Sequence, residues 1–388
     1  MAHNNTSELF RAVVRGDAGE VSRLLIPGVN VNAPGADGFT LLTAASNHGR
    51  VPIISILLGK DADVNQADSF GETPLSTAFG INNFLVIERL LNVPDINTNV
   101  MIRTGVTPLI ASVDSGYDTI VDRLLSYYHV NVNQTSTVGR TALHHACDIG
   151  NIPIIERLLA APDINANLVD ERGRTALHIA SRAGNVAMLE LLLAVRDIDV
   201  NIRDANRDTP LLKAIIYNHL PIINLLLNVN SIDPIQTDRY GMTPLMNATH
   251  SVPIFSRLLR HSAVVADVNH ASPSPEGETV LMSAAKAGKL PIVNLLLELP
   301  LINIHIQDQA GRTAMTLAKQ RGHNSVVNRF IDFENNQGGI MSAAAPAAAP
   351  AAAGQTGAAR RRRSTRRRQR QRQRRLSRKN FRKTKSRK

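Results

Sequence analysis

The sequence predicts an all-α solenoid of stacked helix-turn-helix units, followed by a disordered basic C-terminal tail. Three observations predict the solenoid. A Thr-x-Leu or Thr-x-Met motif recurs nine times at spacings of 33–36 residues, an Ala lies five residues after eight of these threonines, and a leucine pair follows further on in most units. Such a period is the signature of repeat architectures, in which a chain of 388 residues needs no single central core. The threonines are Thr40, Thr73, Thr107, Thr141, Thr175, Thr209, Thr243, Thr279 and Thr313.

Each position of the unit has a physical role at the start of a helix. Gly lies two residues before eight of the nine threonines, where it permits a tight turn at positive φ, and Arg207 is the exception. The Thr hydroxyl can cap the first free N–H groups of a helix. In four units a Pro follows the Thr directly, at the first helical position, where no N–H is needed. In four units a Pro twelve residues after the Thr opens a second helix, whose leucine pair faces the core.

These residues resemble the ankyrin repeat, whose signature is a Gly turn, Thr-Pro-Leu-His-x-Ala and two antiparallel helices. The resemblance covers residues 7–334 in nine units, preceded by a capping pair at 9–14 and 21–26. It implies an ankyrin-repeat solenoid that acts as a protein-binding scaffold. The predicted boundaries are an N-terminal capping repeat at 1–37, eight repeats at 38–310, a C-terminal capping repeat at 311–334, an Ala/Pro/Gly-rich linker at 335–359 and the tail at 360–388.

The stretch Gly-Arg-Thr-Ala-Leu-His-His-Ala-Cys at 139–147 places two histidines beside the only cysteine of the chain. A zinc site or a Cys/His catalytic pair could look like this. The repeat frame instead assigns the stretch to the fourth unit, with His144 at the His position of the ankyrin signature and Cys147 where the family takes a small residue. We therefore expect a buried structural cysteine and no metal or other cofactor. Since the repeats leave no convergent catalytic groups, we expect no enzyme.

Composition predicts a soluble intracellular protein of the cytoplasm, the nucleus or both. A single cysteine cannot form an internal disulfide, and the N-terminal segment MAHNNTSELF has no apolar core of a signal peptide. No apolar run approaches the roughly 20 residues that a membrane helix needs. We expect a monomer without a membrane partner.

An unidentified protein partner is expected on the concave face, which ankyrin families line with turn tips and the exposed ends of the first helices. These positions lie four, three and one residues before each Thr, and seven and eight after it. Tyr and Arg are enriched at binding hot spots, so we expect the strip of Arg172, Arg174, Arg182, Tyr217, Arg239 and Tyr240 to be the centre. Alternatively, these side chains only solvate the turns. The full set is Phe39, Phe70, Ile81, Arg140, Arg172, Arg174, Arg182, Tyr217, Arg239, Tyr240 and Met242.

The seventh unit departs from the pattern. Its leucine pair, Leu258 and Leu259, comes two residues early, and the following turn is longer than its counterparts. The lengthened segment at 270–276 is either a contact loop or tolerated drift in a surface loop.

The basic residues are concentrated at the C-terminal end. Residues 360–388 hold 18 of the 44 Lys and Arg and no acid, which leaves 26 basic against 32 acidic residues in 1–359, a net of −6. Self-repulsion predicts a disordered arm that binds nucleic acid through phosphate charge or is read by an import receptor as a nuclear localisation signal. The arginines expected to carry this role are Arg360, Arg361, Arg362, Arg363, Arg366, Arg367, Arg368, Arg370, Arg372, Arg374 and Arg375, and basic residues precede two candidate phosphorylation sites, Ser364 and Ser377.

Two alternative functions stay open. One is a substrate-recruiting adaptor for ubiquitin ligation, although the sequence shows no F-box or SOCS-type box. The other is a virion- or genome-associated nucleic-acid-binding protein, because the Asp-Ile-Asn turns and the basic tail resemble ankyrin proteins of large DNA viruses.

Overall fold

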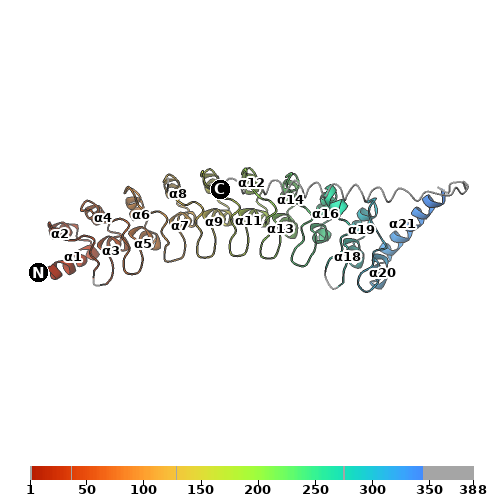
Figure 1. The fold of residues 1–388 in the computed structure, drawn as a ribbon, viewed down its shortest axis with the longest axis horizontal. Coiled ribbons are helices and arrows are strands. Elements are labelled where there is room, and N and C mark those ends of the chain that lie inside the picture. The colour runs from red at the N-terminus through yellow and green to blue at the C-terminus, as the bar shows by residue number, and fades with distance from the viewer. Residues whose placement is uncertain (1, 36, 128, 274–275, 344–388) are drawn as a thin grey trace, which may run out of the picture. The chain divides into compact units, whose positions relative to one another are not determined.

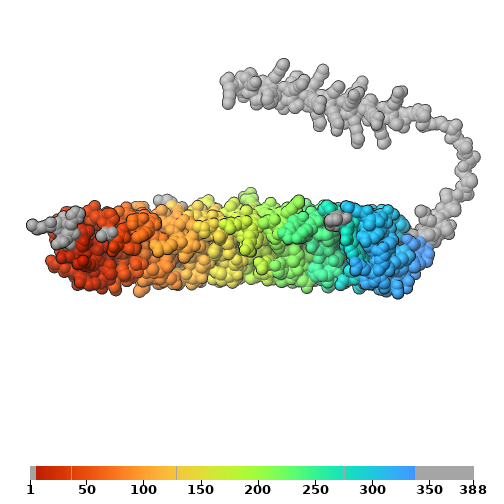
Figure 2. Space-filling model, turned by 90° about the horizontal axis from the view of Figure 1, so that it is seen from below, coloured from red at the N-terminus to blue at the C-terminus, as the bar shows by residue number. Residues whose placement is uncertain are grey.

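The computed structural model describes residues 2–35, 37–127, 129–273 and 276–343 of the chain. Its helices form two rows (Figure 1): the first helix of each unit packs on the first helices of its neighbours, and second helices likewise pack on second helices. Units therefore follow one another in sequence order, as the colours of Figure 2 show. The described residues contain no strand, so the predicted all-α class is confirmed.

The first row consists of α1 (Ala2–Arg15), α3 (Leu41–Asn47), α5 (Pro74–Gly80), α7 (Pro108–Asp114), α9 (Ala142–Ile149), α11 (Ala176–Ala183), α13 (Pro210–Ile216), α15 (Pro244–Asn247), α18 (Val280–Lys286) and α20 (Ala314–Gln320). The second row consists of α2 (Ala18–Leu24), α4 (Val51–Leu58), α6 (Phe84–Leu90), α8 (Asp118–Leu125), α10 (Ile152–Leu159), α12 (Val186–Leu193), α14 (Leu220–Leu226), α16 (Val252–Leu258), α19 (Leu290–Leu297) and the first part, up to Ile331, of α21 (Asn324–Ala343). We call the turn that precedes each repeating Thr a finger.

The repeating threonines are the N-caps of the first helices. Thr40 Oγ1, for example, accepts a hydrogen bond from Thr43 N at 3.0 Å, and the Thr43 hydroxyl lies 2.9 Å from Thr40 N, which donates to it in return. Such a reciprocal capping box satisfies two N–H groups that would otherwise lack partners at the start of a helix. The motif thus specifies where each unit begins.

The core lies between the two rows of helices. The first leucine of the pair is buried in every second helix from α4 to α19, and the alanine five residues after the Thr is buried in most first helices. The small alanines let neighbouring first helices approach, while the leucines fill the space between rows. Burying one such leucine contributes about 1.5–3 kcal/mol.

Asparagine side chains clamp the base of one finger to the base of the next. Asn133 Nδ2 donates to Asp163 O at 2.6 Å, and Asn133 Oδ1 accepts from Asn165 N at 2.8 Å. The same pair of bonds is made by Asn32, Asn65, Asn99, Asn167, Asn201 and Asn269. The series is interrupted at Ile235, which has no amide to offer.

The seventh unit is irregular, as its spacing predicted. Helix α15 has four residues and continues as a 3₁₀ turn, η1 (Ala248–His250), before α16 begins at Val252. The longer turn after the leucine pair forms a short helix, α17 (Ser262–Ala266), in which Val264 is buried.

The last helix extends further than the sequence predicted. Helix α21 runs to Ala343, nine residues beyond Glu334, where we expected the linker to begin. No proline lies between Glu334 and Pro346, so nothing in the chain stops the helix at 334. The rest of the predicted linker and the whole tail lie outside the described residues.

Candidate protein-binding surface

A buried aspartate holds the finger of five units in shape. In finger 6 (residues 197–208), Asp204 Oδ1 accepts hydrogen bonds from Asn206 N at 2.8 Å and Asp208 N at 2.9 Å, and Asp204 N donates to Asp208 O at 2.9 Å. These three bonds close the turn and fix its tip. The five aspartates are Asp68, Asp170, Asp204, Asp238 and Asp308.

The tips of adjacent fingers are tied together by backbone hydrogen bonds. Ala205 N donates to Arg172 O of finger 5 (residues 163–174) at 2.8 Å, and Arg239 N of finger 7 (residues 231–242) donates to Asn206 O at 3.0 Å. Segments paired in this way lie about 4.8 Å apart. The three tips therefore form one continuous surface.

Two of the predicted surface arginines are bound within their own units. Arg174 donates to Asp170 Oδ2 through Nε at 2.9 Å and Nη2 at 2.6 Å, and the Asp170 side chain is 2% exposed. Burial disfavours the Asp170 carboxylate, but the hydrogen bonds from Arg174 outweigh it and lower its pKa. Arg140 pairs with Asp148 and donates to His144 O at 3.1 Å.

Arg182 and Tyr217 meet at the exposed ends of α11 and α13. The Arg182 guanidinium lies over the Tyr217 ring, 5.5 Å from its centroid, and Tyr217 stacks on His219 with ring centroids 6.5 Å apart. Tyr217 is 45% exposed. Two residues that are 35 positions apart in sequence thus form one amphipathic contact surface.

Arg239 and Tyr240 form a second arginine–tyrosine pair at the tip of finger 7. The Arg239 guanidinium lies 4.7 Å from the centroid of the Tyr240 ring and donates to its hydroxyl at 2.5 Å. Arg239 Nη1 also donates to Asn206 Oδ1 at 3.0 Å. Tyr240 is 61% exposed, whereas Met242 of the same finger is only half-exposed.

Arg172 lies at the tip of finger 5, and its side chain is exposed. Within the described part of the chain its guanidinium makes no hydrogen bond or ion pair. Its backbone N–H donates to Asp170 Oδ1 at 2.9 Å, which fixes the tip from which the side chain extends.

The three apolar residues of the predicted set lie near the N-terminal end of the array. Phe39 and Phe70 contact each other across adjacent fingers, with ring centroids 5.4 Å apart, and Phe70 is 60% exposed. Phe39, Phe10 and Val14 also line a groove of about 920 Å³ between α1 and the first finger. Ile81 is 41% exposed at the end of α5.

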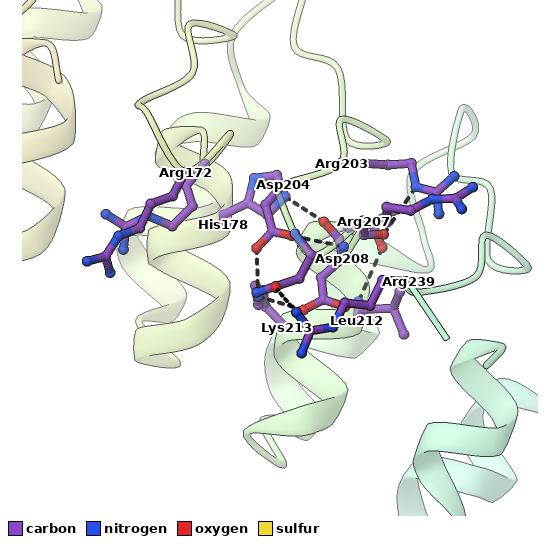
Figure 3. A network of polar contacts seen from close by, with 12 residues as sticks. Arg172, His178, Arg203, Asp204, Arg207, Asp208, Leu212, Lys213 and Arg239 are labelled. Carbon is purple, nitrogen blue, oxygen red and sulfur yellow. Dashed lines mark hydrogen bonds and ion pairs between the residues drawn. The ribbon is translucent and has the colours of Figure 1, made fainter. Parts of the chain in front are cut away.

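A charged cluster that was not predicted from the sequence lies under the tip of finger 6 (Figure 3). Lys213 Nζ lies 2.7 Å from Asp204 Oδ2 and 2.7 Å from Asp208 Oδ2, and its side chain is 13% exposed. Burial disfavours the Lys213 ammonium, but the two carboxylates outweigh it and raise its pKa. Lys213 of α13 therefore neutralises the negative charge of Asp204 and Asp208 in this finger.

Arg203 and Arg207 flank this cluster and were likewise absent from the predicted set. Arg203 donates to Arg207 O at 3.1 Å and to Thr237 O, both carbonyl groups. Arg207 is exposed and has a φ of 62°. Position 207 lacks the glycine that the other eight units have in the turn, and this absence was the sequence signal that could have identified Arg207.

With this geometry established, comparison with known proteins identifies the family. The family model for ankyrin repeats (3 copies) matches overlapping segments that together span residues 9–308. The chain belongs to the ankyrin repeat family. The ankyrin repeat domain of Bcl-3, described as a member of the IkappaB protein family, superimposes with a TM-score of 0.52 and 25% identity. The match covers 58% of this chain and 98% of that domain.

A curated relative matches a shorter part of the ankyrin array. The probable E3 ubiquitin-protein ligase XBOS31 of Oryza sativa subsp. japonica is 37% identical over 86 residues, which are 22% of this chain and 19% of that protein. The match thus spans less than a fifth of the ligase-named protein.

Both ankyrin-signature histidines are structural. His178 Nδ1 accepts a hydrogen bond from Thr175 N at 3.1 Å, and His178 Nε2 lies 3.0 Å from Asp208 O of the next finger. Burial lowers the pKa of His178 to about 4 and also lowers that of His144. Burial raises the pKa of the Cys147 thiol to about 12. A buried thiol that stays protonated is no nucleophile.

The described residues hold neither a candidate metal site nor a membrane-spanning helix. They contain no group of three or more His, Cys, Asp and Glu side chains placed to hold a metal ion. No helix among them is long and apolar enough to cross a membrane. The tail arginines and the candidate phosphorylation sites Ser364 and Ser377 lie outside them.

Proposed function

We propose that this ankyrin protein is a non-enzymatic adaptor that binds a protein partner across units 5 to 7. The observation that carries the proposal is the pair of exposed arginine–tyrosine contacts, Arg182 with Tyr217 and Arg239 with Tyr240. Each ring is contacted by an arginine on one face, and Tyr217 and Tyr240 are still 45% and 61% exposed. Large, preorganised aromatic side chains of this kind are typical binding hot spots.

The other predicted residues contribute unequally to this proposal. Met242 shares finger 7 with the Arg239–Tyr240 pair and Arg172 lies at the tip of finger 5, whereas Arg140 and Arg174 already bind acids of their own units. Phe39, Phe70 and Ile81 would serve a separate contact near the N-terminal end, beside the groove lined by Phe10 and Val14.

The test uses the full-length protein with a photo-crosslinking amino acid at position 217 or 240. We expect both positions to capture the same protein, and the purified pair to bind at least about tenfold more weakly after Tyr217→Ala and Tyr240→Ala together. The matched controls are Leu85→Ala and Leu301→Ala, which remove exposed apolar side chains elsewhere. Equal loss in the controls would overturn the proposal.

We further propose that the basic tail anchors the protein on nucleic acid or serves as its nuclear address. A segment with 18 cations and no acid supports either role, because phosphate neutralisation releases counterions and makes binding steeply salt-dependent. The test compares the full-length protein with a variant in which the eleven predicted tail arginines are glutamine. Salt-dependent binding of duplex DNA or RNA, lost in the variant, supports the anchor. Nuclear import without binding supports the address.

Phosphorylation at Ser364 or Ser377 would weaken an anchor of this kind. Each phosphate cancels up to about two positive charges. Intact-mass measurement of the protein from its native source tests the modification, and an unmodified mass would exclude it.

The match to a protein named as a probable E3 ubiquitin-protein ligase favours one alternative, a substrate-recruiting adaptor for ubiquitin ligation. In that case the captured partner would be ubiquitylated more when the array is intact than in the double tyrosine variant. Unchanged ubiquitylation would remove the alternative.

A further inference from the structure

Arg207 occupies a backbone conformation that the other units reserve for glycine. The eight turn glycines have φ values of 66–83°, and Arg207 has a φ of 62° at the same position. For a residue with a side chain, the left-handed conformation costs roughly 1–2 kcal/mol. Strained residues persist only where the surrounding structure holds them, and they are concentrated at functional sites.

No side-chain contact of Arg207 within the described ranges offsets that strain. The Arg207 side chain is exposed, and its guanidinium makes no hydrogen bond or ion pair within the described ranges. The carbonyl of Arg207 does accept a hydrogen bond from Arg203 Nε, but any residue would supply that carbonyl. The guanidinium is therefore available to a ligand.

Three more arginines without an acidic partner surround Arg207. Arg172 and Arg239 lie on the two adjacent tips, which are tied to finger 6 through Ala205 and Asn206. Arg203 donates to two carbonyl groups and extends away from the Lys213 cluster, as does Arg172 on the other side (Figure 3).

The acids near these tips are already engaged. Lys213 binds Asp204 and Asp208, Arg174 binds Asp170, and Asp238 accepts two backbone N–H groups as well as Asn247 Nδ2. Glu171 is the exposed acid at the same tips. The exposed surface thus presents Arg172, Arg207 and Arg239, with the half-buried Arg203 beside them, against one glutamate.

The spacing of the tips fits an extended polypeptide. Finger 5 is hydrogen-bonded to finger 6, and finger 6 to finger 7. These two steps place the backbones of Arg172 and Arg239 roughly 10 Å apart. Alternate side chains of an extended chain repeat about every 7 Å, so carboxylates two to four residues apart can reach neighbouring tips. Arg239 is preoriented by Asn206 and Tyr240, which reduces the entropy lost on binding.

We propose that the tips of fingers 5 to 7 bind an acidic, extended segment of a partner protein, with Arg207 as the central contact. The inference rests on the proposed protein-binding function and specifies its partner chemistry. An acidic protein segment is favoured over nucleic acid because the patch is only three tips wide and residues 1–359 carry a net charge of −6. That charge repels a long polyanion beyond the patch.

The test uses the full-length protein and a fluorescent twelve-residue peptide of alternating Glu and Ser that carries a benzophenone group. Mapping the photo-adducts by mass spectrometry separates binding at residues 172–240 from binding at the tail. We expect Arg207→Gly to lower adduct yield at the fingers about threefold, and Arg172→Gln, Arg207→Gly and Arg239→Gln together about tenfold. Arg196→Gln, which removes an exposed arginine between α12 and the tip of finger 6, should change nothing.

Arg207→Gly distinguishes a binding role from a structural one, because it relieves the strain at φ 62°. We expect a raised melting temperature together with weaker binding.

Three results would overturn the inference: a lowered melting temperature, adducts confined to the tail, or equal capture of an uncharged control peptide in which Gln replaces Glu. Displacement of the peptide from the fingers by a twelve-nucleotide oligothymidylate, but not by unlabelled Glu-Ser peptide, would assign the patch to nucleic acid instead. A partner lost in the double tyrosine variant but retained by Arg207→Gly would leave the proposed function intact and reject this inference alone.

Discussion

Lys213 Nζ lies 2.7 Å from Asp204 Oδ2, so a side chain of α13 holds the carboxylate that closes the turn of finger 6. Asp208 binds the same ammonium at 2.7 Å. This relationship anchors the finger to its helix and also removes negative charge from beneath the arginine tips. Stability and surface potential in this unit therefore depend on one lysine.

Lys213→Met should lower the free energy of unfolding by about 3–5 kcal/mol, because two largely buried carboxylates would lose their cation. Chemical denaturation followed by circular dichroism measures the change. The matched control is Lys286→Met, whose partners Glu276 and Glu278 lie in a more exposed cluster and whose loss should cost about 1 kcal/mol or less. Equal losses in the two variants would show that the Lys213 cluster stabilises the fold no more than the exposed Lys286 cluster does.

Stability should fall as the pH drops from about 6.5 toward 4. The pKa of His178 is about 4 in the folded protein and about 6.5 when unfolded, so the unfolded chain binds the extra proton over this range. The contribution is complete above pH 6.5, and about 2 kcal/mol of it is lost at pH 5.

Unfolding at pH 7.5 and pH 5 tests this prediction. A His178→Asn variant should be less stable at pH 7.5 but should show a smaller loss between the two values. His144, whose pKa is lowered by burial in the same way, should add to the residual slope. A wild-type stability that is flat between pH 7.5 and pH 5 would contradict the assignment.

Cys147 should resist alkylation in the folded protein. Raising the pKa of the thiol from 9.0 to about 12 reduces the thiolate fraction at pH 8 about a thousandfold, and burial blocks access as well. Iodoacetamide labelling followed by intact mass should show no adduct in buffer and one adduct in denaturant. Rapid labelling of the native protein would indicate that the fourth unit opens locally.

Asn133→Ala should lower the free energy of unfolding by about 1 kcal/mol, because Asp163 O and Asn165 N each lose a hydrogen bond. The control is Asn47→Ala, an exposed asparagine outside the clamp series, which should change stability by less than about 0.5 kcal/mol. If both variants behave alike, the clamp contributes to geometry and not to stability.

The local features of the units could be predicted from the sequence because each depends on residues a few positions apart. Thr40 and its equivalents cap helices through bonds within four residues, and the buried leucine of each second helix follows from the repeat period. The buried state of Cys147 followed from the same frame. Repetition made these weak local signals reliable, since each was observed several times.

The boundary of the last helix and the irregular seventh unit show where local signals end. Helix α21 continues to Ala343 because neither Asn335 nor Gly338 stops a helix as a proline does. The longer turn of the seventh unit was visible as extra residues, but their folding into α17 depends on a place for Val264 in the core.

What the sequence by itself determined is the family, the number and phase of the units, the capping residues and the core. Only the tertiary structure decided which arginines remain free for a partner. Arg174 and Arg172 are two positions apart, yet one binds a buried carboxylate and the other is exposed to solvent. Arg239 meets Asn206 from the preceding finger, and Arg182 meets Tyr217 at the end of the first helix of the next unit. Pairing of this kind depends on rotamers and on distances between units, which no local pattern encodes.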